Sequence, residues 1–307
     1  MHPIITVLLV LGMGMQAQAL TIALSYDSSV TSLANADAVE SAMTYVAQQF
    51  QTLYSDPITI NINVMSVAGT STLGQSSTYL QYSSFSAITG ALSSDSQTAN
   101  DAMAVANLPS TDPITGAHDY IVPLAQAKAL GLRPADDPYT DGIFAFGAGY
   151  TYTFDPNNRA VSGAFDFIGL AQHEISEIMG RIPGLGTTAI TGVPAYLPYD
   201  FFRYSAGVLD MTPGPNDYFS IDGGITNLKN FNNSNGYGGD PQDWASGSND
   251  SFNAYSSSGV ENDMSLVDLQ ALDVMGYDLV PEPGRMVLLV LGVGAALLRR
   301  RRPKYVG

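Results

Sequence analysis

The spacing of apolar residues predicts a β-α-β unit at the start of the chain. Apolar and polar residues alternate over residues 20–26 and again over 58–67, which is the period of a strand with one buried face. Between them, over residues 32–54, apolar residues recur at steps of three and four, as on the buried side of a helix. This order favours two parallel strands with the connecting helix packed on the sheet.

The rest of the chain predicts further short elements. We expect strands at 120–124 and, as a pair, within 141–154, and helices at 125–132 and 263–277. Gly131 and Gly276 stand where these two helices should end. Residues 70–100 are rich in Ser, Thr, Gln and Ala, and neither period fits them.

The most informative stretch is HEISEIMGR, which begins at His173. At 100° per residue, His173 and Glu177 lie one turn apart on the same face of a helix, and Glu174 lies at the edge of that face. Asp166 is placed to cap the start of the helix. The opposite side is apolar and should be buried, at Ile168, Ala171, Ile175, Ile178 and Ile182. One face therefore carries an imidazole and two carboxylates, as a metal-binding helix requires.

Charge and cysteine content exclude several classes of function. The formal net charge is −16, and half of the basic residues lie in the last 23 positions, so the body of the chain is strongly acidic. Such a surface repels phosphate backbones, and we expect no nucleic-acid partner. The chain has no cysteine, which excludes disulfides, thiolate metal sites and cysteine nucleophiles. This composition suits a protein that works outside the cell.

The first 19 residues have the pattern of a secretory signal peptide. An apolar run over residues 4–13 leads to Ala17, Gln18 and Ala19, a small-x-small cleavage pattern. The alternative is a buried N-terminal strand. We expect export, with a mature chain that begins at Leu20.

The composition changes sharply after residue 279. A Pro-Glu-Pro motif at 281–283 is followed by thirteen apolar residues, 286–298, and then by four arginines, 299–302. Thirteen helical residues span about 20 Å, less than the roughly 30 Å of a bilayer core, so a plain tail anchor is the weaker alternative. The basic block would hold this end in the cytoplasm by the positive-inside rule.

These three parts, in this order, resemble the PEP-CTERM sorting signal of Gram-negative bacteria. The resemblance covers residues 279–307 only. It implies an exosortase-type sorting enzyme as a partner, transient contact with the membrane through the apolar helix, and a final location in the cell envelope or at the extracellular surface.

The central helix resembles that of the zincin metalloproteases. A zinc peptidase needs three protein ligands, an open position for water and a carboxylate beside that water. In the HExxH motif both histidines bind the ion and the glutamate is the general base. Here His173, Glu174 and Gly180 match that pattern, whereas Glu177 replaces the second histidine. The motif is therefore HExxE.

The resemblance implies that His173 and Glu177 bind the ion and that Glu174 is the general base. A carboxylate is a legitimate zinc ligand, so Zn²⁺ is expected, and the harder, more anionic site makes Mn²⁺ the alternative. Metzincins take the third ligand ten residues after the first histidine. That position is Pro183, which cannot bind a metal.

A later residue must therefore supply the third ligand. Asp200, in the sequence PYDFFRYS, is the preferred candidate, with Asp222 and His118 in reserve. An ordinary loop aspartate is the competing interpretation of Asp200. Met264, just before the last predicted helix, resembles the Met-turn of metzincins, or is simply a core methionine.

Two further interpretations stay open. The Asn-, Asp- and Gly-rich residues 230–247 are either a plain loop or a structural Ca²⁺ site, because Ca²⁺ prefers oxygen ligands. Arg181 and Arg203 either position acids and stabilise an oxyanion, or form structural ion pairs.

Taken together, residues 20–278 are expected to form one α+β domain of zincin or metzincin type, with a mixed twisted sheet, an active-site helix and a C-terminal closing helix. The leading hypothesis is an exported, metal-dependent endopeptidase that hydrolyses polypeptides with a metal-activated water. The alternative is a non-catalytic envelope or biofilm-matrix protein with a degenerate zincin site.

Overall fold

The structure, a computed structural model, describes residues 20–185, 187–232, 239–245 and 247–281. The predicted signal peptide and the apolar helix and arginine cluster of the predicted sorting signal lie outside these residues. Among the helices within them, none combines the length and hydropathy needed to cross a bilayer.

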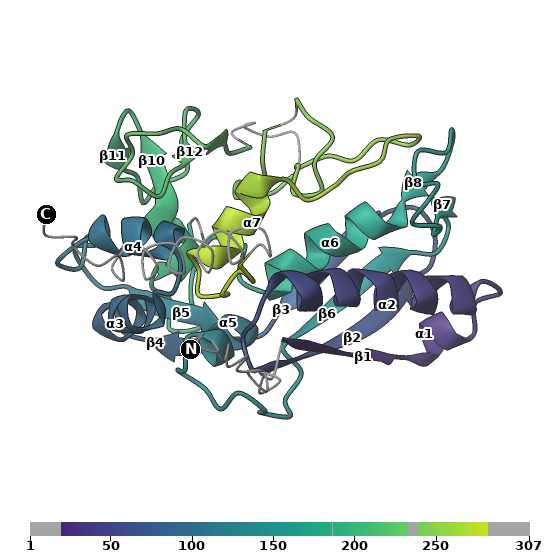
Figure 1. Cartoon of the computed structure of the whole chain (residues 1–307), viewed down its shortest axis with the longest axis horizontal. Helices are drawn as coiled ribbons and strands as arrows, with labels where there is room; N and C mark the ends of the chain where they lie inside the picture. The colour runs from purple at the N-terminus through teal and green to yellow at the C-terminus, as the bar shows by residue number, and fades with distance from the viewer. Residues whose placement is uncertain (1–19, 186, 233–238, 246, 282–307) are drawn as a thin grey trace, which may run out of the picture.

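The largest sheet has the strand order β1-β2-β6-β3 (Figure 1). Its strands are β1 (Thr21–Tyr26), β2 (Thr59–Val67), β6 (Gly142–Gly147) and β3 (Gly74–Thr78). The first three run parallel, and β3 pairs antiparallel with β6 at the edge. The predicted β-α-β start is confirmed, because α2 (Ala36–Leu53) connects the parallel strands β1 and β2, after the single-turn helix α1 (Ser28–Thr31).

Helices α2 and α6 (Phe167–Ile178) lie side by side over this sheet (Figure 1). Alternate side chains of β2, namely Ile60, Ile62 and Val64, are buried, whereas Asn61 and Asn63 between them are half-buried. The alternation in the sequence therefore correctly predicts which side chains of β2 lie on the buried face of the sheet, under the helices. This packing fixes α6 over β6 and the edge strand β3.

Residues 70–100, for which the hydrophobic pattern predicted neither helix nor strand, contain two strands and a helix. They form β3, β4 (Leu80–Ser83) and α3 (Phe85–Asp95), and α4 (Ala99–Ala106) follows. The sequence of β3, GQSST, has no apolar residue. Because β3 is an edge strand, it needs no alternating apolar side chains, and its strand character comes from pairing with β6.

A smaller sheet, β4-β5-β9, lies beside the main one. The predicted strand at 120–124 is β5 (Asp119–Pro123), and the predicted helix at 125–132 is α5 (Leu124–Ala129). The third strand is β9 (Ala195–Tyr196). Gly131, after α5, has a φ of 65°, as a helix-ending glycine should.

The strand pair predicted at 141–154 is wrong in its pairing. Both strands exist, as β6 and β7 (Tyr152–Thr153), but they do not pair with each other. Strand β6 joins the main sheet, and β7 pairs with β8 (Phe165–Asp166) just before α6. Periodicity reports which residues are extended and gives no information on the partner.

The C-terminal part is mostly loops with short elements. These are η1 (Pro198–Phe202), β10 (Arg203–Ser205), β11 (Val208–Leu209), β12 (Tyr218–Phe219), β13 (Lys229–Asn230) and α7 (Leu266–Asp273). Helix α7 is the predicted closing helix and is shorter than expected. Its residues Ala271 and Leu272 are buried in the main core, whereas Leu266 at its first position is 78% exposed. The fold is therefore α+β with parallel and antiparallel strand pairing, as expected.

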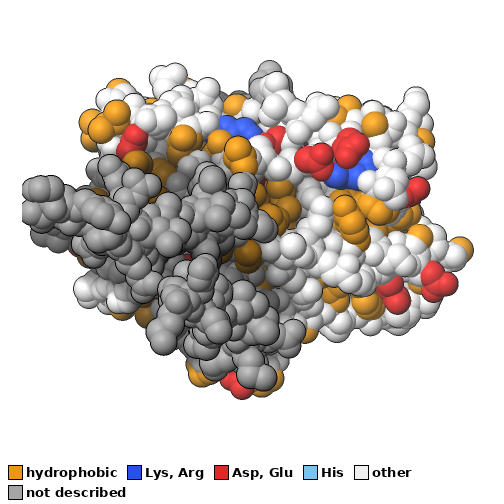
Figure 2. Space-filling model, viewed as in Figure 1, with side chains coloured by type: hydrophobic (Ala, Val, Ile, Leu, Met, Phe, Trp, Pro, Cys, Tyr) orange, Lys and Arg blue, Asp and Glu red, His pale blue; other side chains and the backbone are white. Residues whose placement is uncertain are grey.

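Every lysine and arginine within the described residues has an acidic ion-pair partner. The pairs are Lys128–Asp141, Arg133–Asp137, Arg159–Asp166, Arg181–Asp243, Arg203–Asp217 and Lys229–Asp250. On the face shown in Figure 2, the few basic side chains in view lie beside acidic ones. The remaining acidic side chains therefore leave the described part of the chain with an excess of negative charge.

A cluster of carboxylates lies where the C-terminal end of the described chain contacts the segment after α2. The backbone N–H of Asp278 donates a hydrogen bond of 3.0 Å to the Asp56 carboxylate. Burial, then the nearby charge of Asp278, raises the pKa of Asp56 to about 7. Burial and the charges of Asp278 and Asp56 raise the pKa of Asp95 to about 8. The folded protein thus retains protons that the unfolded chain releases near pH 4.

The stability that this cluster contributes is full below about pH 4 and is lost as the pH rises through 7. We expect Asp56→Asn, which keeps the hydrogen-bond acceptor and removes the charge, to stabilise the protein at pH 8 by about 1–3 kcal/mol, given roughly 1.4 kcal/mol per unit of pKa shift. At pH 4 the effect should vanish. Thermal unfolding at both pH values tests this, with Asp37→Asn on the exposed first turn of α2 as control. Equal melting temperatures of Asp56→Asn and wild type at pH 8 would contradict it.

Candidate metal centre

The apolar stripe predicted for the central helix holds α6 in place. Ile168, Ala171, Ile175 and Ile178 are all fully buried. Ile182 lies beyond the helix end and is only half-buried, where it lines the cleft described below. The opposite side of the helix is therefore the side that can carry chemistry.

Asp166 stands at the N-cap position of α6, but its side chain does not cap the helix as predicted. Its carboxylate instead accepts hydrogen bonds from Arg159, at 3.0 and 2.7 Å, and from the backbone N–H of Asn262 at 2.9 Å. A buried, two-point ion pair with arginine is a stronger partner than a backbone N–H. The start of α6 is thereby tied to the segment around residue 262.

The polar side of α6 forms the floor of a cleft with a volume of about 410 Å³. Three of the predicted site residues, His173, Glu174 and Glu177, lie on this floor. The edge strand β3 forms one wall, and residues from the range 239–262 form the other.

The wall at β3 approaches α6 so closely at Gly74 that a larger residue there would have to displace side chains of the helix. A Cβ atom on Gly74 would lie 2.4 Å from Leu170 Cδ1 and 2.5 Å from Glu174 Oε1. Two positions on, the Ser76 hydroxyl donates a hydrogen bond of 2.7 Å to Glu177 Oε2. The small and polar residues of β3 thus leave space for Glu174 and donate a hydrogen bond to Glu177.

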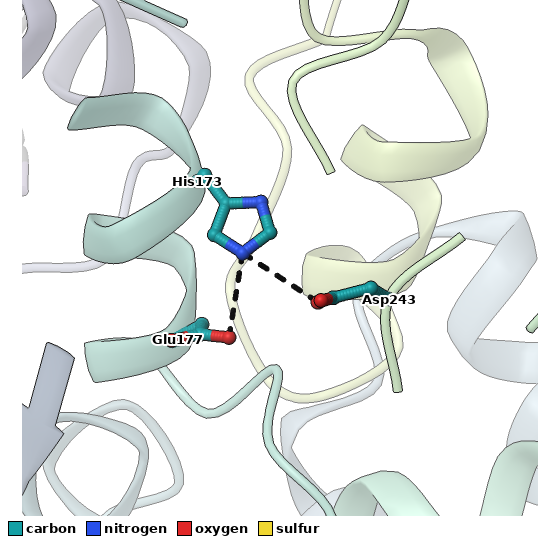
Figure 3. A group of neighbouring side chains, drawn as sticks. All are labelled: His173, Glu177 and Asp243. Carbon is teal, nitrogen blue, oxygen red and sulfur yellow. Dashed lines mark ion pairs between the residues drawn. The ribbon is translucent and has the colours of Figure 1, made fainter. Parts of the chain in front are cut away.

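Three potential ligand atoms meet above the helix (Figure 3). His173 Nε2 lies 3.5 Å from Glu177 Oε1 and 3.6 Å from Asp243 Oδ1, and the three ligand atoms all lie within 4.8 Å of one another. Ligands about 2 Å from a tetrahedral zinc ion are about 3.3 Å apart, by simple geometry. The donor set of one imidazole and two carboxylates therefore fits a divalent cation.

Each donor is held by a second contact. His173 Nδ1 lies 2.8 Å from the carbonyl oxygen of Ser251, which can only accept, so Nδ1 carries the proton and Nε2 faces the other donors. Gln242 Nε2 donates a hydrogen bond of 3.0 Å to Glu177 Oε1. Arg181 Nη1 donates one of 2.6 Å to Asp243 Oδ1. Such contacts are typical of metal ligands, whose orientation they fix.

Burial and the carboxylates of Glu177 and Asp243 dominate the electrostatics of this group. Burial acts to lower the pKa of His173, but Asp243 and Glu177 outweigh it and raise that pKa to about 9. Burial acts to raise the pKa of Glu177, but His173, Arg181 and Ser76 lower it to about 2. Burial and the charge of Glu177 raise the pKa of Glu174 well above its ordinary value. A divalent cation would balance the negative charges of these carboxylates, which bound protons and Arg181 otherwise balance.

The structure does not bring Asp200, the preferred third ligand, together with His173 and Glu177. Asp200 is buried outside the cleft, and its Oδ2 accepts hydrogen bonds from the backbone N–H groups of Gly184, at 2.9 Å, and Leu197, at 2.8 Å. Burial raises its pKa to about 7, against the effect of these two donors. Asp200 therefore stabilises the start of η1. The residue that lies beside His173, where Asp200 was expected, is Asp243.

The reserve candidates also lie elsewhere. His118 contacts Asp112, at 3.0 Å, and the carbonyl oxygen of Gly116, and Asp222 accepts hydrogen bonds from Thr226. Met264 lies in a shallow hollow with residues of α2, outside the cleft, so its position does not support a Met-turn. Arg203 forms a structural ion pair with Asp217.

Asp243 was missed because it lies in the segment that the sequence presents as a low-complexity loop, 230–247. One signal was available: the neighbouring residue is the only tryptophan. Trp244 is fully buried, against Phe219 and Phe231, and anchors the loop beside α6. Among the described residues, the group with His173 is the one that could hold a metal; a structural Ca²⁺ in this segment stays a prediction.

Comparisons with protein-family models, with curated proteins and with solved structures found no match to this chain. Inference about its function therefore depends on the geometry of this cleft.

Proposed function

We propose that the chain is a zincin-like, metal-dependent endopeptidase whose ion is bound by His173, Glu177 and Asp243. The observation that carries this proposal is the convergence of these three donors on the floor of a cleft, with His173 Nε2 directed at both carboxylates. Three protein donors with an open side are the ligand number of catalytic zinc sites. A helix that presents HExxE beside an edge strand supports the zincin-like assignment of the fold.

The chain's own residues supply the remaining parts of peptide hydrolysis. A bound ion would polarise the peptide carbonyl and lower the pKa of a water molecule. Glu174, on the cleft floor but outside the ligand group, takes the proton of that water and passes it to the leaving amine. The outer edge of β3 offers backbone groups to an extended polypeptide, as in strand addition.

Export and sorting belong to the same proposal. The signal-peptide pattern at 1–19 and the PEP-CTERM-like tail at 279–307 favour an envelope or extracellular location in a Gram-negative bacterium. An exosortase-type enzyme would act on the tail, after transient membrane contact through its apolar helix.

One observation favours the alternative, a non-catalytic envelope or biofilm-matrix protein. Arg181 pairs with Asp243 at 2.6 Å, and His173 lies near both carboxylates, so ion pairs can satisfy the group without a metal. Elemental analysis and a casein assay on the purified full chain separate the two. An endopeptidase should contain about one equivalent of metal, lose activity with chelator and regain it with one equivalent of Zn²⁺ or Mn²⁺. Metal-free, inactive protein that takes up neither ion would refute the proposal.

Metal uptake should depend steeply on pH. In the metal-free protein the pKa of His173 is raised to about 9, so at pH 7 a proton occupies the nitrogen that the metal needs. Lowering the pH strengthens this competition, and the apparent affinity should rise about tenfold per pH unit between pH 6 and 8. Titration against a chromophoric chelator at pH 6, 7 and 8 measures this. An affinity that stays constant over this range would contradict a ligand role for protonated His173.

A further inference from the structure

Arg181 contacts all three members of the ligand group: its side chain pairs with the carboxylates of Asp243 and Glu177, and its Nη2 donates a hydrogen bond of 3.4 Å to the backbone carbonyl oxygen of His173. Its side chain is fully buried. Nη1 lies 2.6 Å from Asp243 Oδ1, and Nη2 lies 3.7 Å from Glu177 Oε1. Nε donates a hydrogen bond of 2.8 Å to the Ser176 hydroxyl, and the guanidinium stacks on Phe252 at 4.5 Å from the ring centre. The position of the guanidinium is therefore fixed on several sides.

These contacts bring together parts of the chain that are far apart in sequence. Asp243 follows Arg181 by 62 positions and lies on a loop, whereas Glu177 belongs to α6. Both carboxylates are almost completely buried, and two like charges this close repel each other strongly. Without a cation between them, they would be expected to separate or to take up protons.

We propose that Arg181 is the positioning residue of the metal site: it brings Asp243 to α6 and balances the charge of the two carboxylates before the metal arrives. This inference rests on the proposed function. The two carboxylates together carry a charge of −2, and the guanidinium beside them reduces this to −1. Arg181 thus ties the loop that carries Asp243 to α6 through contacts of its own, separate from those that the metal would make.

Lysine cannot replace the whole of this role. Its ammonium is a single point charge, whereas guanidinium presents donors in a planar fork and stacks on aromatic rings. Arg181→Lys should therefore keep the charge and lose the simultaneous contacts with Ser176, Asp243 and Phe252. Arg181→Met should lose both the charge and the fork at similar volume.

The test measures metal affinity, by competition with a chromophoric chelator for Zn²⁺ at pH 7.5, for the full-chain wild type and three variants. We expect Arg181→Met to weaken binding by about 10–100-fold, as loss of a contact to a metal ligand does. Arg181→Lys should fall between the two. The matched control is Arg159→Met, which removes an equally buried arginine whose partners, Asp166, Glu261 and Asp263, are not ligands. It should lower the melting temperature and leave metal affinity within about threefold of wild type.

The outcomes separate this inference from the proposed function. Wild-type affinity in Arg181→Met would overturn the positioning role while leaving the endopeptidase proposal intact. Equal losses of affinity in Arg159→Met and Arg181→Met would also overturn it, because general damage to the fold would explain both. A wild type that binds no metal would refute the proposed function and this inference together. Should Arg181→Met fail to fold, Arg181→Lys against wild type decides, and an unchanged affinity counts against the proposal.

Discussion

Replacing Glu174 with glutamine is expected to abolish casein hydrolysis and leave the metal content unchanged. Glu174 is 5% exposed on the cleft floor and stands outside the three converging donors. Burial and the charge of Glu177 raise its pKa in the metal-free protein, so it holds a proton readily. Glutamine has nearly the same shape but cannot accept a proton from water. Loss of a general base costs about 10²–10⁴ in rate.

The measurement is kcat/KM on a casein-derived peptide, beside elemental analysis of the same preparation. Glu40→Gln on α2, outside the cleft, is the matched control and should behave as wild type. Undiminished hydrolysis by Glu174→Gln would remove Glu174 from the mechanism. Loss of the metal along with activity would instead place Glu174 among the ligands.

Asp243→Asn should nearly eliminate metal binding, whereas Asp200→Asn should not affect it. Asparagine at 243 can still accept the hydrogen bond from Arg181, so the loop keeps its anchor, but the anionic donor is lost. Because loss of a mere outer contact already costs about 10–100-fold in affinity, loss of a ligand should cost about 100-fold or more. Asp200 contacts backbone N–H groups instead, and its amide variant can accept the same two hydrogen bonds.

Chelator competition with Zn²⁺ at pH 7.5 compares these two variants directly. Both exchange a buried carboxylate for an amide, so a difference between them reports ligand identity and not the removal of buried charge in general. The reverse order, with Asp200→Asn losing the ion and Asp243→Asn retaining it, would return the third ligand to the position predicted from the sequence.

Local periodicity was sufficient to predict several helices and strands of the fold. Alternation identified β1 and β2, and a step of three to four residues identified α2, the buried stripe of α6 and the closing helix. The same local geometry placed His173 and Glu177 together, because residues four apart on a helix always share a face. Two of the three proposed ligands could therefore be predicted without any knowledge of distant contacts.

The third proposed ligand depends on contacts between distant segments. Asp243 lies 70 positions after His173, in a segment without periodicity, and it reaches the site because Trp244 is buried and Arg181 binds its carboxylate. The residues around Asp200 were equally compatible with a metal ligand, yet its carboxylate accepts hydrogen bonds from the backbone N–H groups of Gly184 and Leu197. The edge strand β3 carries no apolar signal and depends on pairing with β6. Such positions follow from packing between distant segments, which no local spacing of residues encodes.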